Sequence, residues 1–445
     1  MKQPRVLVIT IGRINSSDTT NNGLLLRNLF GTSLPKENIA QVYSSGNNDD
    51  AGFFGHYYQL QDCDRVLGSL FYKLKGNTIA PPLTTTNNTF NTPIKKIQKL
   101  KAFIQRILID TGLYELIFKP KISKEMKSWV EEFQPDIIFA QGYNLTFTWL
   151  PVLLKKATGA KLAYLTTDDW PTYLYSGQLG EPTLFRWFIR PIVKTATDQL
   201  LSAVDVAFAF GQPMTKEYSS RYDKPFITLN HADSQSRFDN AIPQRINPVD
   251  ITTIVAIGNY NQFRWPLLID INEACELLHK QGINARLLVL SSAIEPEGIQ
   301  ALSATQFIDV LPDPGNDLLP SYLKGADILL LAEGFDEGFV SAIKLSISSK
   351  AHLFMFSHRP IIVYAHADTG IANYAQEFGW SKLVTTRSKI ELAATIRQLI
   401  EDKDQRNSLI AHADQVAKNY HSHQINQATL LTGLTSCLTH HGEDK

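Results

Sequence analysis

The chain has 445 residues, of which 44% are hydrophobic and 19% are charged. This length predicts two domains of about 200 residues each, and the composition excludes a disordered chain. Lysine plus arginine equals aspartate plus glutamate at 43 each, which argues against nucleic acid as the main partner.

The cysteines and the apolar runs bear on the compartment. Cys63, Cys275 and Cys437 lie far apart without a CxxC pair, so neither a disulfide framework nor a structural zinc site is expected. The chain enters a short strand at 5–10 without the apolar region and cleavage site of a signal peptide. No apolar run reaches the roughly 20 residues that span a bilayer. We therefore expect a cytoplasmic protein.

Apolar strands alternate with helical stretches in the first half of the chain. The strand over 5–10 leads into a polar, glycine-containing loop from Gly12 to Gly23 and then a helix over 24–30. Residues 78–92, rich in Pro, Thr and Asn, have the composition of a loop or lid. The other elements that the pattern predicts are strands over 136–140, 161–165 and 204–210 and a helix over 148–157.

A second α/β series begins at residue 251, after a connector around 230–248. Strands separated by helices predict parallel βαβ units, with ligands at the carboxyl ends of the strands. A long loop is expected between 331 and a helix that opens near Ser349, and two or three helices close the chain. The predicted strands are 251–258, 286–290, 307–311, 327–331, 360–364 and 382–386, and the predicted helices include 267–280 and 318–324.

Two landmarks near the start of this second series resemble motifs of the family-4 glycosyltransferases. Asn230-His231-Ala232-Asp233, with Phe238 five residues later, is similar to the NGVD…F signature at the domain junction of that family. The strand 255–258, with Arg264 six residues after its end, resembles the family's phosphate-binding turn. His231 is expected to be structural rather than catalytic.

Two further landmarks follow in the family's order. Residues 311–325, leading into 326–330, are similar to its "aDv" segment. Ser349-Lys350-Ala351-His352-Leu353, followed by 359–364, resembles its donor-binding helix and strand. The resemblance covers nearly the whole chain.

The resemblance implies an α/β protein of the GT-B class, with two doubly wound Rossmann-like domains facing a central cleft. Residues 1–230 would form the acceptor-side domain, 231–250 a connector and 251–415 the nucleotide-sugar-binding domain. The helices over 416–445 can return to the first domain. The implied activity is a retaining, metal-independent transfer of a sugar from a nucleotide-diphosphate donor to a glycan or lipid-linked acceptor in surface polysaccharide biosynthesis. No metal or other cofactor is implied.

The sequence departs from the family at three places. Leu345 and Leu353 stand where the family has a Glu-x₇-Glu pair, and Gln141 stands where many relatives have histidine. Asp168 and Asp169 occupy the turn in which relatives have a His-Asp pair. These departures keep two alternatives open: a GT-B binding or scaffold subunit without catalysis, and a nucleotide-sugar epimerase.

Arg264, Ser349 and Lys350 are the candidates for binding the donor's diphosphate. Departure of a diphosphate needs positive charge or N–H dipoles, because negative charge grows on the leaving oxygen. Lys350 is expected in the first turn of a helix after two serines, at an end that attracts anions. Arg264 can add a bidentate contact. Taken singly, each cation can equally be an ordinary surface residue.

Two loops at strand ends offer further contacts to the donor. In Glu333-Gly334-Phe335-Asp336-Glu337-Gly338-Phe339, either Glu333 or Glu337 can bind sugar hydroxyls and replace the missing carboxylate pair. The alternative is an acidic surface loop. In the turn Asp368-Thr369-Gly370, Thr369 and Gly370 can contact phosphate through the backbone, or Thr369 can simply cap a helix.

On the N-terminal side, Asn22 and Gly23 stand where relatives use a glycine pair to let backbone approach the ligands. Asp168 and Asp169 are the carboxylates best placed to bind or deprotonate an acceptor hydroxyl. The alternative is that one caps the next segment and the other is solvated.

Two other groups of residues are less specific. The stretch from Lys95 to Lys127 is basic, with apolar residues at helical spacing from 94 to 108. It can form an amphipathic helix at the inner face of an anionic membrane, or an ordinary core-packed helix. The pairs His421/His423 and His440/His441 are expected to be solvated rather than bound to metal.

Overall fold

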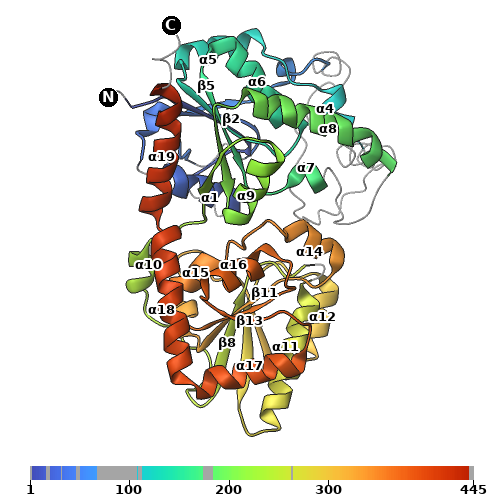
Figure 1. The fold of residues 1–445 in the computed structure, drawn as a ribbon, viewed down its shortest axis with the longest axis vertical. Coiled ribbons are helices and arrows are strands. Elements are labelled where there is room, and N and C mark those ends of the chain that lie inside the picture. The colour runs from blue at the N-terminus through green and yellow to red at the C-terminus, as the bar shows by residue number, and fades with distance from the viewer. Residues whose placement is uncertain are drawn as a thin grey trace, which may run out of the picture. The chain divides into compact units, whose positions relative to one another are not determined.

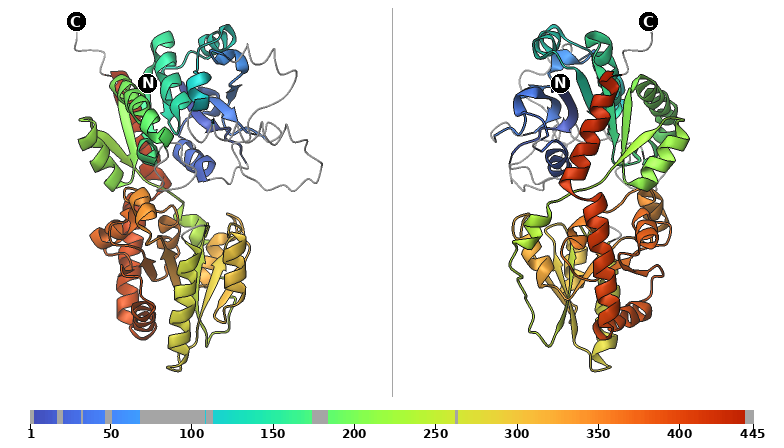
Figure 2. Two further views of the ribbon diagram at one scale, coloured as in Figure 1. Left: turned by 90° about the vertical axis from the view of Figure 1, so that its right-hand side faces the viewer. Right: turned by 60° about the vertical axis from the view of Figure 1, so that its left-hand side comes forward.

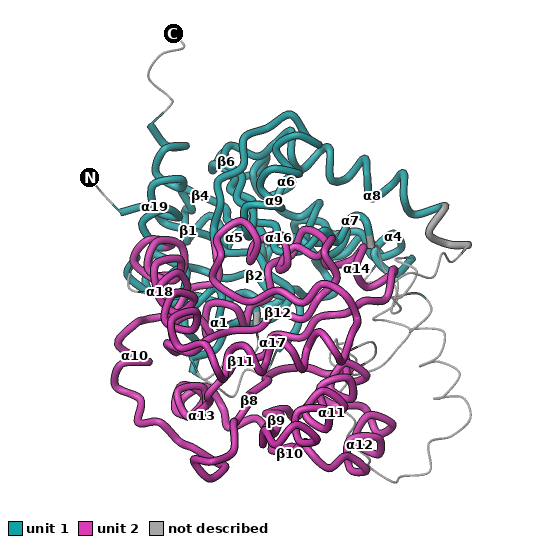
Figure 3. Tube along the Cα trace, turned by 60° about the horizontal axis from the view of Figure 1, so that its bottom comes forward, with its two compact units in different colours: residues 1–229, 427–445 teal, residues 230–426 magenta. Residues whose placement is uncertain are grey.

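The computed structural model describes residues 3–16, 21–31, 33–46, 51–67, 108, 113–173, 184–261 and 264–439. The chain divides into two compact units (Figures 1 and 3). Unit 1 comprises Met1–Leu229 and Gln427–Lys445, and unit 2 comprises Asn230–Asn426. Each unit is built on a parallel β-sheet with helices on its faces.

Among the described residues, the sheet of unit 1 has seven strands in the order β3-β2-β1-β4-β5-β6-β7. All neighbours pair in parallel, with Val6 opposite both Ile39 and Ile137. A sheet covered on both faces needs strands that are apolar throughout, and β4 is buried along its whole length. The strands are β1 (Val6–Gly12), β2 (Ile39–Ser45), β3 (His56–Gln59), β4 (Ile137–Gln141), β5 (Lys161–Thr166), β6 (Val206–Phe210) and β7 (Phe226–Leu229).

Side-chain caps fix where several helices of unit 1 begin. The hydroxyl of Ser123 accepts a hydrogen bond from Met126 N at the start of α5, and the amide oxygen of Asn144 accepts one from Phe147 N at the start of α6. The helices are α1 (Asn21–Phe30), α4 (Leu113–Ile117), α5 (Lys124–Phe133), α6 (Leu145–Thr158), α7 (Trp170–Tyr173), α8 (Leu184–Ala203), α9 (Gln212–Arg221) and α19 (His423–Thr439), with 3₁₀ turns η1 (Lys36–Asn38) and η2 (Asp62–Asp64).

The last helix belongs to the core of unit 1. From Gln427 onward, α19 runs along this unit, as the right-hand view of Figure 2 shows. Leu430 and Leu434 are fully buried in the same apolar cluster as Phe208 and Leu229. A Cβ atom at Gly433 would lie 2.6 Å from the Phe208 ring, so glycine lets the helix approach the sheet closely.

The sheet of unit 2 has six parallel strands among the described residues, in the order β10-β9-β8-β11-β12-β13. Its strands are β8 (Thr252–Ile257), β9 (Ala285–Leu290), β10 (Ile308–Leu311), β11 (Ile328–Ala332), β12 (Ile361–Tyr364) and β13 (Lys382–Val384). Its helices are α10 (Gln235–Asp239), α11 (Trp265–His279), α12 (Pro296–Ser303), α13 (Leu319–Gly325), α14 (Glu337–Ile343), α15 (Ala351–Met355), α16 (Gly370–Phe378), α17 (Lys389–Glu401) and α18 (Lys403–Tyr420).

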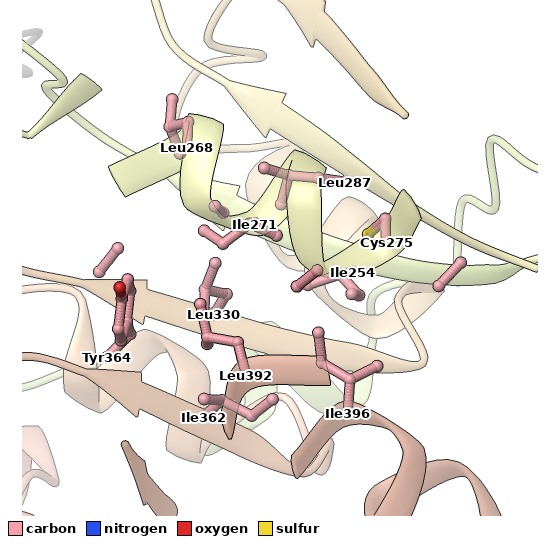
Figure 4. Close-up of a cluster of buried hydrophobic side chains, with 14 of the residues drawn as sticks. Ile254, Leu268, Ile271, Cys275, Leu287, Leu330, Ile362, Tyr364, Leu392 and Ile396 are labelled. Atoms are coloured by element: carbon pink, nitrogen blue, oxygen red, sulfur yellow. The ribbon is translucent and has the colours of Figure 1, made fainter. Parts of the chain in front are cut away.

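Alternate residues of the unit 2 strands face two apolar layers. Ile254 and Leu330 pack with Ile271 of α11 and Leu392 of α17 in the layer shown in Figure 4. The residues between them face the layer that contains α13, α15, α16 and α18. This burial on both sides holds the strand ends in fixed positions, and the loops that follow them carry the candidate site.

The chain enters unit 2 at Asn230 and leaves it at Asn426, and these two segments bind each other. Asp233 N donates to His421 O over 2.9 Å, and His423 N donates to Asp233 O over 3.2 Å. Asn230 N donates to Asn426 Oδ1 over 2.7 Å. The entry and exit of unit 2 are therefore joined by backbone and side-chain hydrogen bonds.

Two predicted loops are partly helical. The loop expected from Gly12 to Gly23 ends earlier, because α1 already begins at Asn21. The long loop expected after β11 contains α14, since Asp336 caps it by accepting a hydrogen bond from Phe339 N over 3.1 Å. The predicted loop 78–92 and the apolar spacing over 94–107 lie outside the described residues.

In the part of the chain that the structure describes, no helix is both long enough and apolar enough to cross a membrane.

Candidate functional site

The candidate site lies where the strand order of unit 2 reverses. The chain builds β8, β9 and β10 toward one edge and then returns to place β11 on the other side of β8. At such a switch point the loops after the two central strands diverge, which is where open α/β sheets bind ligands. Arg264 lies in the loop after β8, and Glu333 directly follows β11.

Arg264, Glu333 and Lys350, here called the cation cluster, come together at this point. Glu333 Oε2 lies 3.0 Å from Arg264 Nη2, and Glu333 Oε1 lies 3.8 Å from Lys350 Nζ. The Glu333 side chain is 4% exposed, that of Lys350 14% and that of Arg264 24%. Two cations and one carboxylate leave the cluster with one net positive charge, which suits it to bind an anion.

The hydrogen bonding of the cation cluster is incomplete among the described residues. Glu333 Oε2, Arg264 Nε and the Tyr260 hydroxyl are buried there without a hydrogen-bond partner. Native proteins rarely leave buried polar atoms unpaired, because each costs about 1–3 kcal/mol. A polar ligand at this position would supply the missing partners.

Gly258 makes room for Lys350. It follows β8 with a φ of +111°, a conformation that favours glycine. A Cβ atom added to Gly258 would lie 2.2 Å from Lys350 Cε, so the lysine side chain passes directly over this glycine. Lys350 Nζ also lies 5.8 Å from the centre of the Tyr260 ring.

The electrostatics of the cluster follow from burial and from the charges within it. Burial lowers the pKa of Lys350; Glu333 opposes that shift, and Arg264 reinforces it. Burial and the nearby Glu333 charge raise the pKa of Tyr260. The Tyr260 hydroxyl is therefore a neutral donor at physiological pH.

The loop from Glu333 to Phe339 places an aromatic ring against Arg264 of the cation cluster. A Cβ atom at Gly334 would lie 2.2 Å from the Phe339 ring, so glycine allows that ring to fold back. Arg264 Cζ then lies 4.9 Å from the ring centre. Glu337 is exposed in the first turn of α14 and makes no ion pair among the residues described.

The other donor-side candidates lie at helix starts. Lys350 is the N-cap of the short helix α15 and Ser349 precedes it half-buried, so the lysine lies just before the helix. Thr369 caps α16, accepting a hydrogen bond from Ala372 N over 3.3 Å. A Cβ atom at Gly370 would lie 2.5 Å from Ser346 O. Gly370 therefore permits close backbone packing.

In unit 1, Asp169 is held by a closed network. Arg221 donates to both of its carboxylate oxygens, over 2.8 and 3.1 Å. The hydroxyls of Tyr218 and Thr172 add hydrogen bonds of 2.7 and 2.8 Å. Burial alone would lower the pKa of Arg221, but the hydrogen bonds and charge of Asp169 raise it above its usual value. These hydrogen bonds hold the turn in place and give Asp169 a structural role in it.

Asp168 differs from its neighbour because it is accessible to solvent. The protein packed around it still desolvates the carboxyl group and raises its pKa. The Thr167 hydroxyl donates to Asp168 Oδ2 over 3.4 Å and also hydrogen-bonds to the Tyr143 hydroxyl. Tyr143 in turn accepts a hydrogen bond of 2.9 Å from Gln141 Nε2. A polar chain thus runs across the carboxyl ends of β4 and β5 to Asp168.

Asn22 and Gly23 lie in the first turn of α1, not in a loop, because the helix begins at Asn21.

The structure also reveals a histidine cluster that the sequence did not indicate. The rings of His231 and His352 stack at 5.8 Å, and those of His352 and His421 at 6.0 Å. His421 is 2% exposed and hydrogen-bonds to the Tyr374 hydroxyl and to His231 O. The expectation that His421 is solvated is wrong, because the paired segments at the boundary of unit 2 bury it, and His423 is half-buried there. His440 and His441 lie outside the described residues.

Burial keeps these imidazoles neutral. It lowers the pKa of His231 to about 3 and that of His421 to about 4. Within the described residues, no group of three or more His, Cys, Asp or Glu side chains is arranged to hold a metal ion.

Comparison with known proteins adds the fold. No protein-family model matches the sequence, and a search of curated proteins finds no match either. Solved structures do match. Sucrose-phosphate synthase from Thermosynechococcus elongatus has a TM-score of 0.63 at 13% identity, covering 99% of this chain and 100% of that chain. WaaG, a glycosyltransferase involved in lipopolysaccharide biosynthesis, has a TM-score of 0.57 at 12% identity, covering 96% and 100%.

HepE from Anabaena, in a complex with UDP and glucose, has a TM-score of 0.58 at 11% identity, covering 98% of this chain and 100% of that chain. These matches extend over nearly the full length of each protein. This chain has the GT-B fold. The predicted α/β class with two Rossmann-like domains is therefore confirmed, and the cation cluster lies in the second domain of that fold.

Proposed function

We propose that the chain is a glycosyltransferase that binds the diphosphate of a nucleotide-sugar donor at Arg264 and Lys350. The observation that carries this proposal is the convergence of two partly buried cations on Glu333 at the switch point of the unit 2 sheet, where Lys350 passes over Gly258. The GT-B fold supports it, since one protein of similar structure was solved with UDP and glucose.

The chemistry follows from the charge that leaves with the nucleotide. As the bond from the sugar to the diphosphate breaks, negative charge accumulates on the terminal phosphate oxygen. The Arg264 guanidinium can bind two phosphate oxygens in parallel, and Lys350 supplies a second cation. With these two cations at the phosphate, the transfer needs no metal ion, and Ser349 can add a hydroxyl contact.

Carboxylates would handle the sugar and the acceptor. Glu337 is exposed at the start of α14 and is the member of the Glu333/Glu337 pair that is open to sugar hydroxyls. Asp168 is the accessible carboxylate of unit 1, and its raised pKa suits a group that binds or deprotonates an acceptor hydroxyl. Asp169 would position Asp168 through the turn that it fixes.

We further propose a retaining transfer to a glycan or lipid-linked acceptor in surface polysaccharide biosynthesis. The likeness to WaaG, a glycosyltransferase of lipopolysaccharide biosynthesis, supports this choice. The basic stretch Lys95 to Lys127 would let a cytoplasmic enzyme contact the inner face of an anionic membrane. Sedimentation with phosphatidylserine vesicles tests that contact, and binding that 0.5 M salt does not weaken would contradict it.

A GT-B scaffold without catalysis is the second candidate, favoured by Leu345 and Leu353 at positions where carboxylates were expected. A panel of UDP-, GDP-, ADP- and dTDP-sugars separates the functions by following free nucleoside diphosphate and sugar identity. Slow diphosphate release without interconversion supports the transferase. Interconversion without an acceptor would identify an epimerase, and absence of binding to every donor would leave only the scaffold.

A further inference from the structure

Glu333 is unusual among the ionisable groups of unit 2, because its carboxylate faces both cations that would bind a diphosphate. Its two oxygens face different partners, Arg264 at 3.0 Å and Lys350 at 3.8 Å. The residue is 3% exposed. The Glu333 carboxylate thus already interacts with the two cations that would otherwise be free to bind an anion.

We propose that Glu333 is an internal competitor for these cations, which the donor's diphosphate displaces on binding. The inference rests on the proposed function, because it assigns Arg264 and Lys350 to the diphosphate. It adds that the site binds anions weakly, and that Glu333 determines how much each additional negative charge on the ligand lowers the affinity.

The incomplete hydrogen bonding distinguishes this arrangement from a structural ion pair. Asp169 in unit 1 accepts hydrogen bonds from Arg221, Tyr218 and Thr172, whereas Glu333 Oε2 has none among the described residues although Arg264 lies close. Arg264 Nε and the Tyr260 hydroxyl are likewise unpaired there. A contact that leaves three polar atoms without partners is easier to displace than one that satisfies them.

The charge argument also gives a selectivity. A free nucleoside diphosphate carries up to one more negative charge than a nucleotide sugar, because its terminal phosphate ionises with a pKa near 6. Repulsion by a nearby buried carboxylate grows with that charge. Glu333 therefore weakens binding of the product more than binding of the donor, and so promotes release of the product after transfer.

The test compares Glu333→Gln with the wild type by calorimetric titration of UDP and UDP-glucose, with the ADP and GDP pairs in parallel. The amide keeps the size of the side chain and removes its charge. We expect about tenfold tighter binding of the nucleoside diphosphate and about threefold tighter binding of the nucleotide sugar. Glu276→Gln is the matched control, since it removes one charge from an exposed ion pair with Lys280 in the same unit and should leave both affinities unchanged.

The outcomes separate the two proposals. If the wild type binds a nucleoside diphosphate and Glu333→Gln binds it equally or more weakly, the competitor role is overturned while the proposed function stands. Weaker binding of the nucleotide sugar alone would assign Glu333 to the sugar, which also overturns it. Absence of binding in both proteins would overturn the proposed function itself.

A second variant covers the case in which Glu333→Gln does not fold because two partly buried cations lack a counter-ion. Glu333→Asp keeps the charge and withdraws it by one methylene from the cations. It should bind the nucleoside diphosphate about threefold more tightly than the wild type. An unchanged or weaker affinity of this variant would contradict the competitor role.

Discussion

Two buried carboxylates, one in each unit, are held in opposite ways. Asp169 of unit 1 is buried with hydrogen bonds to both of its oxygens, so the ion pair with Arg221 is closed. Glu333 of unit 2 is buried equally well, yet it faces two cations and leaves an oxygen without a partner among the described residues. A satisfied buried charge holds a turn in place. An unsatisfied one beside excess positive charge marks a place for a ligand.

The largest expected effect is on the closed network of unit 1. Asp169→Ala should lower the free energy of unfolding by about 3 kcal/mol, because it leaves Arg221 without a buried partner. Asp198→Ala, which breaks only the exposed pair with Lys194, should cost less than about 1 kcal/mol. Urea denaturation measures both, and equal losses would show that the Asp169 network is not a structural element.

The next effect is expected from acid, which should lower the free energy of unfolding by protonating the neutral histidines of unit 2. His421 has a pKa of about 4 in the folded protein against an ordinary value of 6.5, so the unfolded chain binds the proton more readily. Its contribution is complete above pH 6.5 and is lost as the pH falls toward 4, amounting to about 3 kcal/mol. About 2 kcal/mol of it should already be lost between pH 7 and pH 5, and denaturation at these two pH values measures that loss.

A variant checks that assignment. His421→Gln has no imidazole to protonate at this position and should lose less stability than the wild type between these two pH values. Identical losses in both proteins would show that His421 does not carry the acid sensitivity.

Whereas the role of Asp169 is tested through stability, the role of Asp168 is tested through activity. Asp168→Asn should reduce the turnover of sugar transfer about 100-fold, because it removes the proposed acceptor base. Binding of nucleoside diphosphate, measured by calorimetry, should not change. If turnover is also unchanged, the acceptor-side role of Asp168 is wrong.

The strand pattern made most of the fold predictable, whereas the site depended on contacts between distant residues. Short apolar runs such as 254–257 and 328–332 favour strands buried on both faces, and their short length and regular alternation with helical stretches indicated the two sheets. Arg264 was predicted from its place in the loop after the first strand of unit 2 and Lys350 from its place in the first turn of a helix, both at positions that match motifs of the family. Nothing local indicated that Glu333 would lie between them, since that pairing depends on the crossover between β8 and β11.

Other features were missed for similar reasons. Asp169 pairs with Arg221, which lies at the C-terminal end of α9. The His231, His352 and His421 rings come into contact only when the segments that enter and leave unit 2 pair with each other. α14 lies in a segment that was expected to be a loop, although Asp336 is a good cap. Closed networks and clusters of this kind require the tertiary structure.

A smaller effect is expected at Gly258, where the absence of a side chain leaves room for Lys350. Gly258→Ala should weaken binding of nucleoside diphosphate about tenfold, because its Cβ would displace the lysine side chain. Gly282→Ala is the matched control, since Gly282 also has a positive φ, of +81°, but an added Cβ would touch nothing within 4 Å. Equal effects of the two variants on affinity would contradict the role of Gly258.

The central claim is that the cation cluster binds the diphosphate of the donor. Its direct test is calorimetric titration of UDP, GDP and ADP into the wild type and Lys350→Ala, with Lys280→Ala as an exposed-lysine control. The account predicts at least about 100-fold weaker binding to Lys350→Ala, from loss of a charge-assisted contact, and no change in the control. A folded Lys350→Ala protein that binds the nucleotide as tightly as the wild type would contradict it.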